Sequence, residues 1–293
     1  MYYRRKLLLA LIESLGGNLK RTDCQKLLFL FCQTVGKNHY DFFPYQFGAF
    51  SFLAYYDKSR LTEIGLLQAS DDFQLGTRQS FISQLTSSDQ AALKILLSSV
   101  DSLRGRELIR KTYLEYPHFA SRSKIASQLL SPAEIEQVKF AWNMDAAPCL
   151  FTIGYEGLTV DAFLNRLITN NILAVIDVRN NPQSMKYGFS KKTLEHYIES
   201  AGMKYIHIPE LGIPSPLRKG LSTPASYHRL FEKYELQIIP MQISAVSRVK
   251  SLISAHSRVA LVCFESDHLF CHRHKLVEFL RKDNSLRASV IHL

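Results

Sequence analysis

The sequence predicts an α/β fold, a mostly parallel sheet with helices on both faces, preceded by a mainly helical, winged-helix-like N-terminal domain. Two observations lead to this prediction. From Cys149 onward, short apolar runs alternate with stretches of helical spacing, which is typical of parallel sheets whose strands are joined by helices. Before that point, leucines recur at helical spacing. We therefore divide the chain into residues 1–80, a helical connector at 81–147 and an α/β domain at 148–293.

Composition indicates a globular protein of the cytoplasm. Of the 293 residues, 46% are hydrophobic, enough to supply hydrophobic cores. The five cysteines are an odd number without the spacing of a disulfide framework, so a reducing compartment is expected. No apolar run is long enough to cross a membrane, and no charged leader precedes an apolar segment. The net charge of +10 predicts attraction to polyanions such as DNA.

The N-terminal eighty residues read as three helices and a hairpin. Thr22 and Gln25 form a possible capping box for the second helix. An aromatic loop at 40–50 precedes a third helix at 51–64, and its proline and glycine set a bend. Three short helices with a glycine-containing hairpin are typical of a winged helix-turn-helix.

The aromatic loop runs from Tyr40 to Ser51 as Tyr-Asp-Phe-Phe-Pro-Tyr-Gln-Phe-Gly-Ala-Phe-Ser, after a leucine-rich helix. In this respect the segment resembles the amino-terminal domain of the Panacea/SocA-like antitoxin families. The resemblance implies a recognition helix whose polar and basic side chains meet phosphates or base edges. The residues concerned are Ser51, Tyr55, Lys58 and Arg60. The alternative is a winged helix that binds a protein and has a solvated face.

The connector at 81–147 reads as helical and basic, with aromatic side chains between the charges. Such a surface can follow a phosphate backbone and stack on bases. It can equally be an ordinary helix surface whose aromatic side chains pack inward. Ser131, Pro132 and Glu134 predict a helix start, and Pro148 marks the boundary at 145–148. The basic side chains expected to contact DNA are Arg104, Arg106, Arg110, Lys111, Arg122 and Lys124.

Five strands and five helices are expected in the α/β domain. The strands are predicted at Leu150–Ile153, Leu173–Val178, Lys204–Ile208, Val259–Phe264 and Ala288–Ile291. The helices are predicted at Thr159–Ile168, Lys191–Ala201, Ser226–Leu236, Ile243–Ala255 and His272–Arg281.

Two of these strand-like runs end close to paired acidic and basic residues. Asp177 and Arg179 end one, and Glu265 and Arg273 follow the other. Side chains just past the carboxyl ends of parallel strands line the ligand crevice, so we expect all four to share one site. Asp177 and Glu265 are the candidate catalytic carboxylates, and guanidinium groups suit phosphate. A structural ion-pair network is the alternative.

Further motifs accompany these residues along the chain. They are Thr152-Ile153-Gly154-Tyr155, Phe163, Asp177-Val178-Arg179, Pro182, Ser184, Phe189-Ser190, Tyr205, Pro209-Glu210-Leu211-Gly212 and Cys263-x-Glu265 with Cys271-His272-Arg273. In this order they resemble the domain-of-unknown-function 488 family, from about Cys149 to Leu293. The resemblance implies no reaction. It implies that the matching positions cluster at one pocket of an α/β domain.

We expect nine residues to contact the substrate at that pocket. They are Gly154, Tyr155, Arg179, Phe189, Tyr205, Glu210, Cys271, His272 and Arg273. The turn that starts at Gly154 can direct backbone N–H groups at an anion, or it can be a simple strand-to-helix turn. The aromatic rings can hold a base removed from its stack, or they can belong to the core.

Cysteine and histidine residues near the last strand raise the question of metal binding or nucleophilic catalysis. Cys263, Cys271 and His272 are soft ligands, but the cysteines lack a standard zinc spacing. Cys271 and His272 are neighbours on a predicted helix, so they point in different directions and make a poor nucleophile–base pair. Cys263 reads as a small core residue. No metal or other cofactor is predicted.

Together these features favour an enzyme that acts on nucleic acid, and the preferred hypothesis is a DNA glycosylase. The enzyme would flip a modified base out of double-stranded DNA and cleave its N-glycosidic bond, with Asp177 and Glu265 as catalytic groups. A role in defence against phage DNA is a further hypothesis. One alternative is a metal-dependent nuclease or nucleotide-processing hydrolase. Another is a DNA-binding transcriptional regulator whose C-terminal domain senses a ligand.

Overall fold

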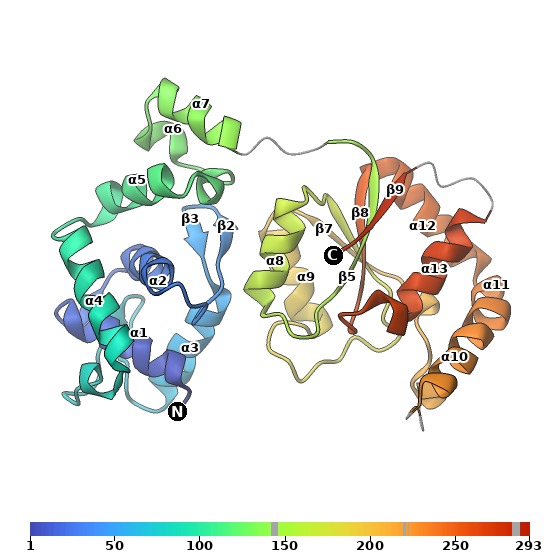
Figure 1. The fold of residues 1–293 in the computed structure, drawn as a ribbon, viewed down its shortest axis with the longest axis horizontal. Coiled ribbons are helices and arrows are strands. Elements are labelled where there is room, and N and C mark those ends of the chain that lie inside the picture. The colour runs from blue at the N-terminus through green and yellow to red at the C-terminus, as the bar shows by residue number, and fades with distance from the viewer. Residues whose placement is uncertain (142–145, 219–220, 222, 283–287) are drawn as a thin grey trace. The chain divides into compact units, whose positions relative to one another are not determined.

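The computed structural model describes residues 1–141, 146–218, 221, 223–282 and 288–293. The chain divides into two compact units, Met1–Asn143 and Met144–Leu293. In Figure 1 the first unit is mainly helical, whereas the second has a central sheet flanked by helices. Of the boundary predicted at 145–148, Asp145 lies outside the described residues.

The N-terminal unit contains helices with two small antiparallel sheets, which pair β1 with β4 and β2 with β3. The longer elements are α1 (Tyr3–Ser14), α2 (Arg21–Val35), α3 (Phe52–Glu63), α4 (Ser87–Val100), α5 (Gly105–Glu115) and α7 (Pro132–Ala141). The shorter ones are β1 (Asn18–Leu19), β2 (Phe43–Tyr45), β3 (Gly48–Phe50), β4 (Phe73–Gln74), η1 (Ile82–Gln84), η2 (Pro117–Ala120) and α6 (Ala126–Leu129).

Helix α2 is the central element of this unit, because its side chains are buried on every side from Asp23 to Cys32. It contacts α1, α4 and α5. The last two come from the segment predicted as a connector, so that segment packs into the N-terminal unit. Lys26 on α2 donates to the carbonyl oxygen of Ala49 at 2.7 Å, and burial lowers its pKa to about 7.

The helix starts follow the sequence prediction in part. Ser131 and Glu134 exchange the expected hydrogen bonds at the start of α7, because each satisfies a backbone N–H group of the other residue. The capping box predicted at Thr22 and Gln25 is wrong. The side chain of Gln25 binds both backbone groups of Ser51 instead, and this ties α2 to the start of α3.

The C-terminal unit alternates strands with helices as predicted. Its strands are β5 (Cys149–Gly154), β6 (Ala174–Asp177), β7 (Lys204–His207), β8 (Arg258–Cys263) and β9 (Ser289–His292). Its longer helices are α8 (Val160–Thr169), α9 (Lys191–Ser200), α10 (Pro224–Lys233), α12 (Ile243–His256) and α13 (His272–Arg281). Shorter elements are η3 (Pro209–Leu211), η4 (Ser215–Arg218), η5 (Tyr234–Ile238), α11 (Ile239–Met241) and η6 (His268–Phe270).

The five strands form one parallel sheet in the order β7-β6-β8-β5-β9, which confirms the predicted α/β class. Figure 1 shows α8 and α9 on one face and α10, α12 and α13 on the other. Successive residues of a strand point to opposite faces, so Leu150, Ile176 and Leu261 share one core cluster with side chains of α10, α12 and α13. Both faces of the inner strands β5, β6 and β8 are therefore covered, whereas the edge strand β9 is largely exposed.

The register of the sheet places two candidate residues at the same edge but on opposite faces. Asp177 at the end of β6 lies beside Val262 of β8. Cys263 is the next residue of β8 and points to the other face. The carboxyl end of the sheet thus separates two groups of polar side chains.

None of the helices in the described part of the chain is long and apolar enough to cross a membrane.

Candidate functional site

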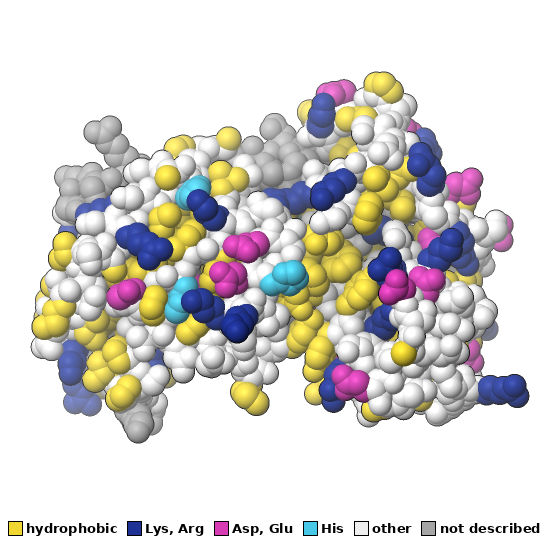
Figure 2. Space-filling model, turned by 180° about the vertical axis from the view of Figure 1, so that it is seen from behind, with side chains coloured by type: hydrophobic (Ala, Val, Ile, Leu, Met, Phe, Trp, Pro, Cys, Tyr) yellow, Lys and Arg dark blue, Asp and Glu magenta, His cyan; other side chains and the backbone are white. Residues whose placement is uncertain are grey.

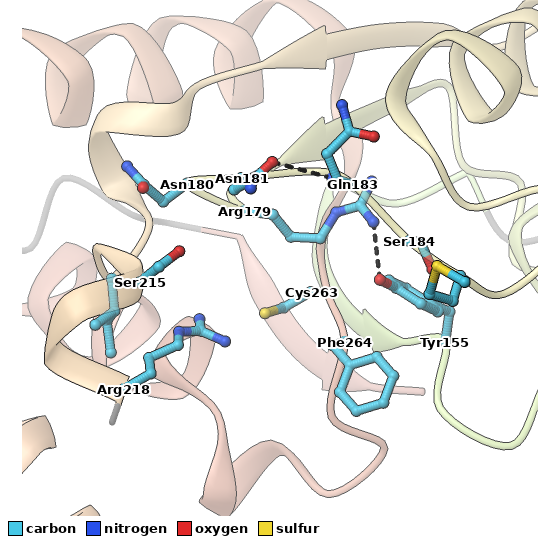
Figure 3. A pocket seen from close by; sticks show the side chains of 12 residues that line it. Tyr155, Arg179, Asn180, Asn181, Gln183, Ser184, Ser215, Arg218, Cys263 and Phe264 are labelled. Carbon is cyan, nitrogen blue, oxygen red and sulfur yellow. Dashed lines mark hydrogen bonds between the residues drawn. The ribbon is translucent and has the colours of Figure 1, made fainter. Parts of the chain in front are cut away.

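A cavity of about 320 Å³ lies at the carboxyl end of the parallel sheet, where the crevice of such folds is expected. Each of the four strands β5 to β8 is followed by residues that line it. Among the lining residues are Tyr155, Arg179, Asn180, Ser215, Arg218 and Cys263. Figure 3 shows the Cys263 thiol between the Arg179 and Arg218 side chains. Motifs that are far apart in the sequence therefore meet at one cavity.

Asp177 and Arg179 form a buried ion pair beside this cavity. Arg179 donates from Nε to Asp177 Oδ1 at 2.8 Å and from Nη2 to Oδ2 at 2.6 Å. The Tyr205 hydroxyl donates to Oδ2 at 2.7 Å. Burial acts to lower the pKa of Arg179, but the bonds to Asp177 outweigh it and raise this pKa. The Asp177 side chain is fully buried, and its two oxygens already accept several hydrogen bonds.

The aromatic residues predicted to hold a base pack against each other. The rings of Tyr155 and Phe189 stack at 4.2 Å with an interplanar angle of 9°. Arg179 donates from Nη1 to the Tyr155 hydroxyl and to the Phe189 carbonyl oxygen, both at 2.8 Å. The space between the two rings is therefore closed to a third ring. Tyr155 still contributes to the cavity wall.

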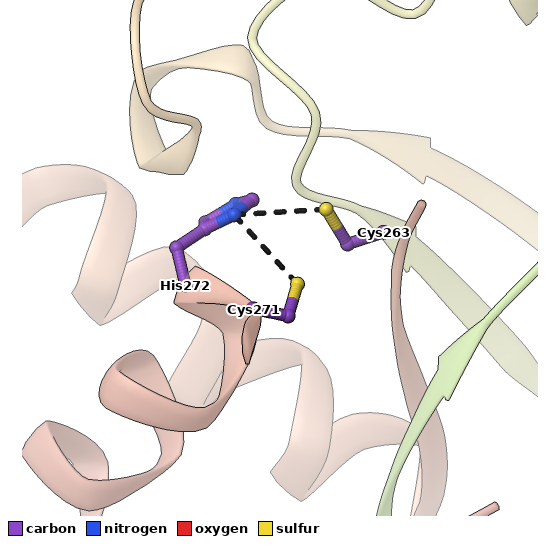
Figure 4. A group of neighbouring side chains, drawn as sticks. All are labelled: Cys263, Cys271 and His272. Carbon is purple, nitrogen blue, oxygen red and sulfur yellow. Dashed lines mark hydrogen bonds between the residues drawn. The ribbon is translucent and has the colours of Figure 1, made fainter. Parts of the chain in front are cut away.

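On the other face, two sulfur atoms and one nitrogen atom converge beside the cavity. Cys263 Sγ is 3.6 Å from His272 Nδ1, and Cys271 Sγ is 3.9 Å from the same nitrogen. Figure 4 shows both thiols directed at the imidazole ring. The sequence interpretation of Cys271 and His272 was wrong, because Cys271 has extended backbone angles and precedes the first turn of α13. The two side chains therefore reach the same point.

The hydrogen bonding of His272 identifies the ring nitrogen that donates. Its Nε2 lies 3.2 Å from the carbonyl oxygen of Val178. A carbonyl only accepts hydrogen bonds, so Nε2 carries a proton, and Nδ1 faces the two sulfurs with a lone pair in the neutral ring and with a proton in the cation. Burial tends to lower the pKa of His272, but Cys263 outweighs it and raises this pKa.

The close approach of these groups shifts their ionisation in different directions. Burial tends to raise the pKa of Cys263, but the Cys271 thiol and His272 outweigh it and bring this pKa well below its usual range. Burial and the neighbouring Cys263 raise the pKa of Cys271. Burial and Cys263 also raise the pKa of the Glu265 carboxyl. Cys263 is therefore the thiol of the pair that ionises first.

Glu265 and Arg218 complete this second group. Glu265 Oε2 lies 3.3 Å from Cys263 Sγ, and Arg218 Nη1 lies 3.6 Å from Glu265 Oε1. The Glu265 side chain is 25% exposed and lines a smaller cavity of about 110 Å³, whose wall shares Arg218 with the larger one. A carboxyl group, a thiol and a guanidinium are thus within reach of the two cavities.

Arg273 and Gly154 hold the loop that carries Glu265. Arg273 is fully buried and donates to the backbone oxygens of Glu265 and Ser266 at 2.6 and 3.0 Å. A Cβ atom at Gly154 would lie 1.7 Å from the Glu265 oxygen, so only glycine fits. The N–H groups of Tyr155 and Glu156 donate to β8 and the residue after it, so they are not free to bind an anion.

The predicted site therefore divides into three sets. Asp177, Arg179, Tyr155, Phe189 and Tyr205 form one hydrogen-bonded group. Cys271, His272 and Glu265 form the other, with Arg273 and Gly154 behind it. Glu210 lies in η3 and is exposed; it does not contribute to either cavity wall.

Sequence reasoning missed Arg218 and the importance of Cys263. Cys263 ends the middle strand of the parallel sheet, a position that the strand prediction could have marked. Arg218 had no such signal, because it lies in η4 beyond the motif that ends at Gly212.

A separate cluster consists of His268, His274 and His292, whose ring nitrogens also lie close together. The rings of His268 and His292 stack at 3.8 Å, only 6° from parallel. Burial and the two neighbouring histidines lower the pKa of His292 to about 4. His274 Nε2 lies 3.2 Å from Glu278 Oε1.

The residues predicted to contact DNA from α3 have partners within the N-terminal unit. Ser51 is buried and caps α3 through the N–H of Ala54. Tyr55 stacks on Phe50. Lys58 donates to two backbone oxygens, at 2.7 and 2.6 Å, and Arg60 pairs with Glu63.

Most of the basic residues predicted to contact DNA from segment 81–147 also have partners within the N-terminal unit. Arg110 pairs with Glu134 and Lys111 with Glu115, whereas Arg104 and Arg106 donate to backbone oxygens. Burial lowers the pKa of Arg122, and Lys124 is exposed. Figure 2 shows Lys and Arg side chains on both units with acidic side chains among them.

Comparison with protein families adds one finding. Residues 159–280 match the family model described as Domain of unknown function DUF488. This stretch is similar to that domain. The matched stretch lies within the predicted range and contains most residues of both polar groups. Tyr155 and the strands β5, which ends at Gly154, and β9 lie outside it. Neither a curated protein nor a solved structure matches the chain.

Proposed function

We propose that the protein is a hydrolase that acts on a nucleotide unit of DNA. It cleaves the N-glycosidic bond between base and sugar, with Glu265 as the catalytic group. The observation that carries this proposal is the contrast between the two carboxylates. Asp177 is sealed among hydrogen-bond donors, whereas Glu265 is partly exposed beside a thiol and Arg218. Of the two predicted catalytic carboxylates, Glu265 is the one that is partly exposed and lines a cavity, as a group that exchanges a proton with a substrate must be.

The size and lining of the larger cavity support a nucleotide as ligand. A volume of about 320 Å³ falls in the range of small-molecule sites. Tyr155 and Phe264 provide aromatic surface, and Asn180 and Asn181 provide amide groups that can pair with a base. Arg218 is 35% exposed, and its planar guanidinium suits a phosphate group.

The proposed reaction is hydrolysis. The oxygen of a water molecule bonds to C1′ of the sugar, the bond from C1′ to the base nitrogen breaks, and its electron pair goes to the base. Glu265 accepts a proton from the water and this proton passes to the departing base, so the products are a free base and an abasic sugar. Arg179 and Arg273 are positioning residues in this scheme, because they hold the cavity wall and the Glu265 loop.

We further propose that the N-terminal unit is a winged-helix-like module that binds double-stranded DNA, with the target base flipped into the cavity. The net charge of +10 supports this, as does the hairpin β2–β3 directly before α3. Pairing of Arg60, Arg110 and Lys111 with acidic neighbours does not prevent phosphate contact, because exposed ion pairs are weak. A modified base, as found in phage DNA, is the proposed substrate class.

A second candidate is a metal-dependent, nucleotide-processing hydrolase. The observation that favours it is the convergence of Cys263, Cys271 and His272 on one point. A metal ion there would bind water next to Glu265, and the same cavity would hold the nucleotide.

The test is mass spectrometry of the material released from modified and unmodified DNA. The proposal predicts free base together with abasic sites that break in mild alkali, and Glu265→Gln should lower their formation by roughly 100-fold or more. Glu210→Gln is the matched control, because Glu210 is exposed and lines neither cavity. Released nucleotides would favour the second candidate. Intact DNA across differently modified substrates would contradict both.

A further inference from the structure

Three donor atoms, one of them from a residue that lines the larger cavity, have the spacing of a metal site. Cys263 Sγ and Cys271 Sγ lie 3.6 and 3.9 Å from His272 Nδ1, and all three atoms lie within 4.8 Å of one another. A tetrahedral zinc ion, with bonds of about 2.3 Å to sulfur and about 2.0 Å to nitrogen, separates these donors by roughly 3.5 Å. Only small movements would therefore bring the ligands to bonding distance.

The surroundings of His272 are those of a metal-bound imidazole. Histidine ligands generally donate their second N–H group to a carbonyl or carboxylate, which fixes the ring orientation. His272 Nε2 makes this contact with Val178 O at 3.2 Å, and Tyr234 packs edge-on against the ring at 5.4 Å. The ring is held with Nδ1 directed at the sulfurs without help from the substrate.

We propose that Cys263, Cys271 and His272 bind a zinc ion whose fourth position faces the cavity and Glu265. Two thiolates and an imidazole suit zinc, and three protein ligands with an open fourth position are typical of catalytic rather than structural sites. Cys263 lines the cavity, and Glu265 Oε2 lies 3.3 Å from its sulfur. A zinc-bound water would thus stand beside Glu265, and zinc makes such a water a better nucleophile.

The unusual sequence spacing follows from the elements that carry the ligands. Zinc motifs with two closely spaced cysteines place both on one turn. Here Cys263 ends β8, and Cys271 directly precedes α13, with η6 between them. The loop and Arg273, which binds its backbone, bring the two thiols together.

The Arg218 side chain must move away from His272 when the ion binds. Its Nη2 lies 3.4 Å from His272 Nδ1, the nitrogen that would bind zinc. The Arg218 side chain is 35% exposed, so it can turn toward the cavity. In that position it would face a bound anion instead of the imidazole.

The cluster of His268, His274 and His292 is a poorer site and serves as the internal control. The lone pairs of an imidazole lie in the plane of its ring. Because the His268 and His292 rings stack almost parallel at 3.8 Å, their lone pairs run side by side and do not meet at one ion. His292 Nδ1 is also 2.7 Å from Thr152 Oγ1.

The experiment measures zinc on the full chain, purified under reducing conditions without an affinity tag that binds metal. We expect one zinc per chain after exposure to zinc and dialysis. Cys271→Ser should weaken zinc binding by roughly 100-fold or more, since loss of a partner outside the ligands alone costs 10–100-fold. His274→Gln should retain the zinc. Loss in His274→Gln with retention in Cys271→Ser, or no zinc on the wild type, would overturn the proposal.

Cobalt substitution gives a second measurement that needs no variant. Cobalt bound by Cys263 and Cys271 should give the intense near-ultraviolet absorption of a thiolate-bound ion and the visible bands of a tetrahedral one. The absence of both at saturating cobalt would also overturn the proposal, even if Cys271→Ser failed to fold. The zinc site does not rest on the glycosidic reaction. If the protein binds zinc but releases no free base from DNA, the zinc site stands and only the proposed function is contradicted.

Discussion

At the carboxyl end of the sheet, the polar groups on the two faces differ in how fully they are hydrogen-bonded. On the face of α8 and α9, Asp177 and Arg179 exchange several hydrogen bonds and are closed off by Tyr205. On the other face, Cys263 and Glu265 lie at cavity walls with loose contacts of 3.3 Å or more. A carboxylate whose lone pairs all accept hydrogen bonds stabilises the fold, whereas a carboxylate with lone pairs still available can take part in chemistry.

The difference matters because the sequence makes the two carboxylates look equivalent. Each follows a buried parallel strand and each has an arginine nearby. In the structure, Arg179 binds the carboxylate of Asp177, whereas Arg273 binds only the backbone oxygens of Glu265 and Ser266. The comparison assigns a structural role to the first arginine–carboxylate pair and leaves the second carboxylate free to act.

The largest effect is expected from breaking the structural pair. Asp177→Asn leaves the buried Arg179 guanidinium without its counter-charge, so the free energy of unfolding should fall by about 3–5 kcal/mol. Urea denaturation followed by circular dichroism measures it. Glu210→Gln, at an exposed carboxylate, should change it by less than about 0.5 kcal/mol. A loss below about 1 kcal/mol for Asp177→Asn would contradict the structural role assigned to the pair of Asp177 and Arg179.

A smaller loss of stability is expected from Tyr205→Phe. The variant removes one hydrogen bond to the Asp177 carboxylate and keeps the ring, so it should cost about 2 kcal/mol. Product formation by the fraction of protein that remains folded should stay near that of the wild type. A neutral effect on stability would mean that the Tyr205 hydroxyl does not contribute to holding Asp177.

The smallest effect is expected from Arg218, which lines both cavities. Arg218→Met should weaken the binding of a deoxynucleoside 5′-monophosphate by roughly 10-fold, since a charge-assisted hydrogen bond is lost. Isothermal titration calorimetry measures the dissociation constant. Arg229→Met removes an exposed arginine of α10 and should leave it unchanged. Equal binding by Arg218→Met and the wild type would show that the anion does not meet this side chain.

The inner strands β5, β6 and β8 were predictable because buried parallel strands are almost continuously apolar. All five were expected within one or two residues of their positions, and the shared edge for Asp177, Arg179 and Glu265 followed from strand direction. The positions of the strands can be read from local sequence, since each strand is one short segment of the chain.

The roles within the site were not predictable from such runs. Asp177 is saturated by the hydroxyl of Tyr205 on β7, and Arg179 by the carbonyl of Phe189. Both partners come from other segments, so no local pattern reports them. Cys271 and His272 converge because Cys271 is extended, whereas the helical spacing predicted that they diverge. Which groups remain available for chemistry is a property of the assembled packing.

The most direct test compares Glu265→Gln with Tyr205→Phe in one assay of free base released from modified DNA, per folded molecule. If the chemistry is on the Cys263 face, Glu265→Gln lowers the rate by roughly 100-fold or more, and Tyr205→Phe stays within about threefold of the wild type. Loss of release in Tyr205→Phe with full release in Glu265→Gln would place the reaction at Asp177 and contradict the account.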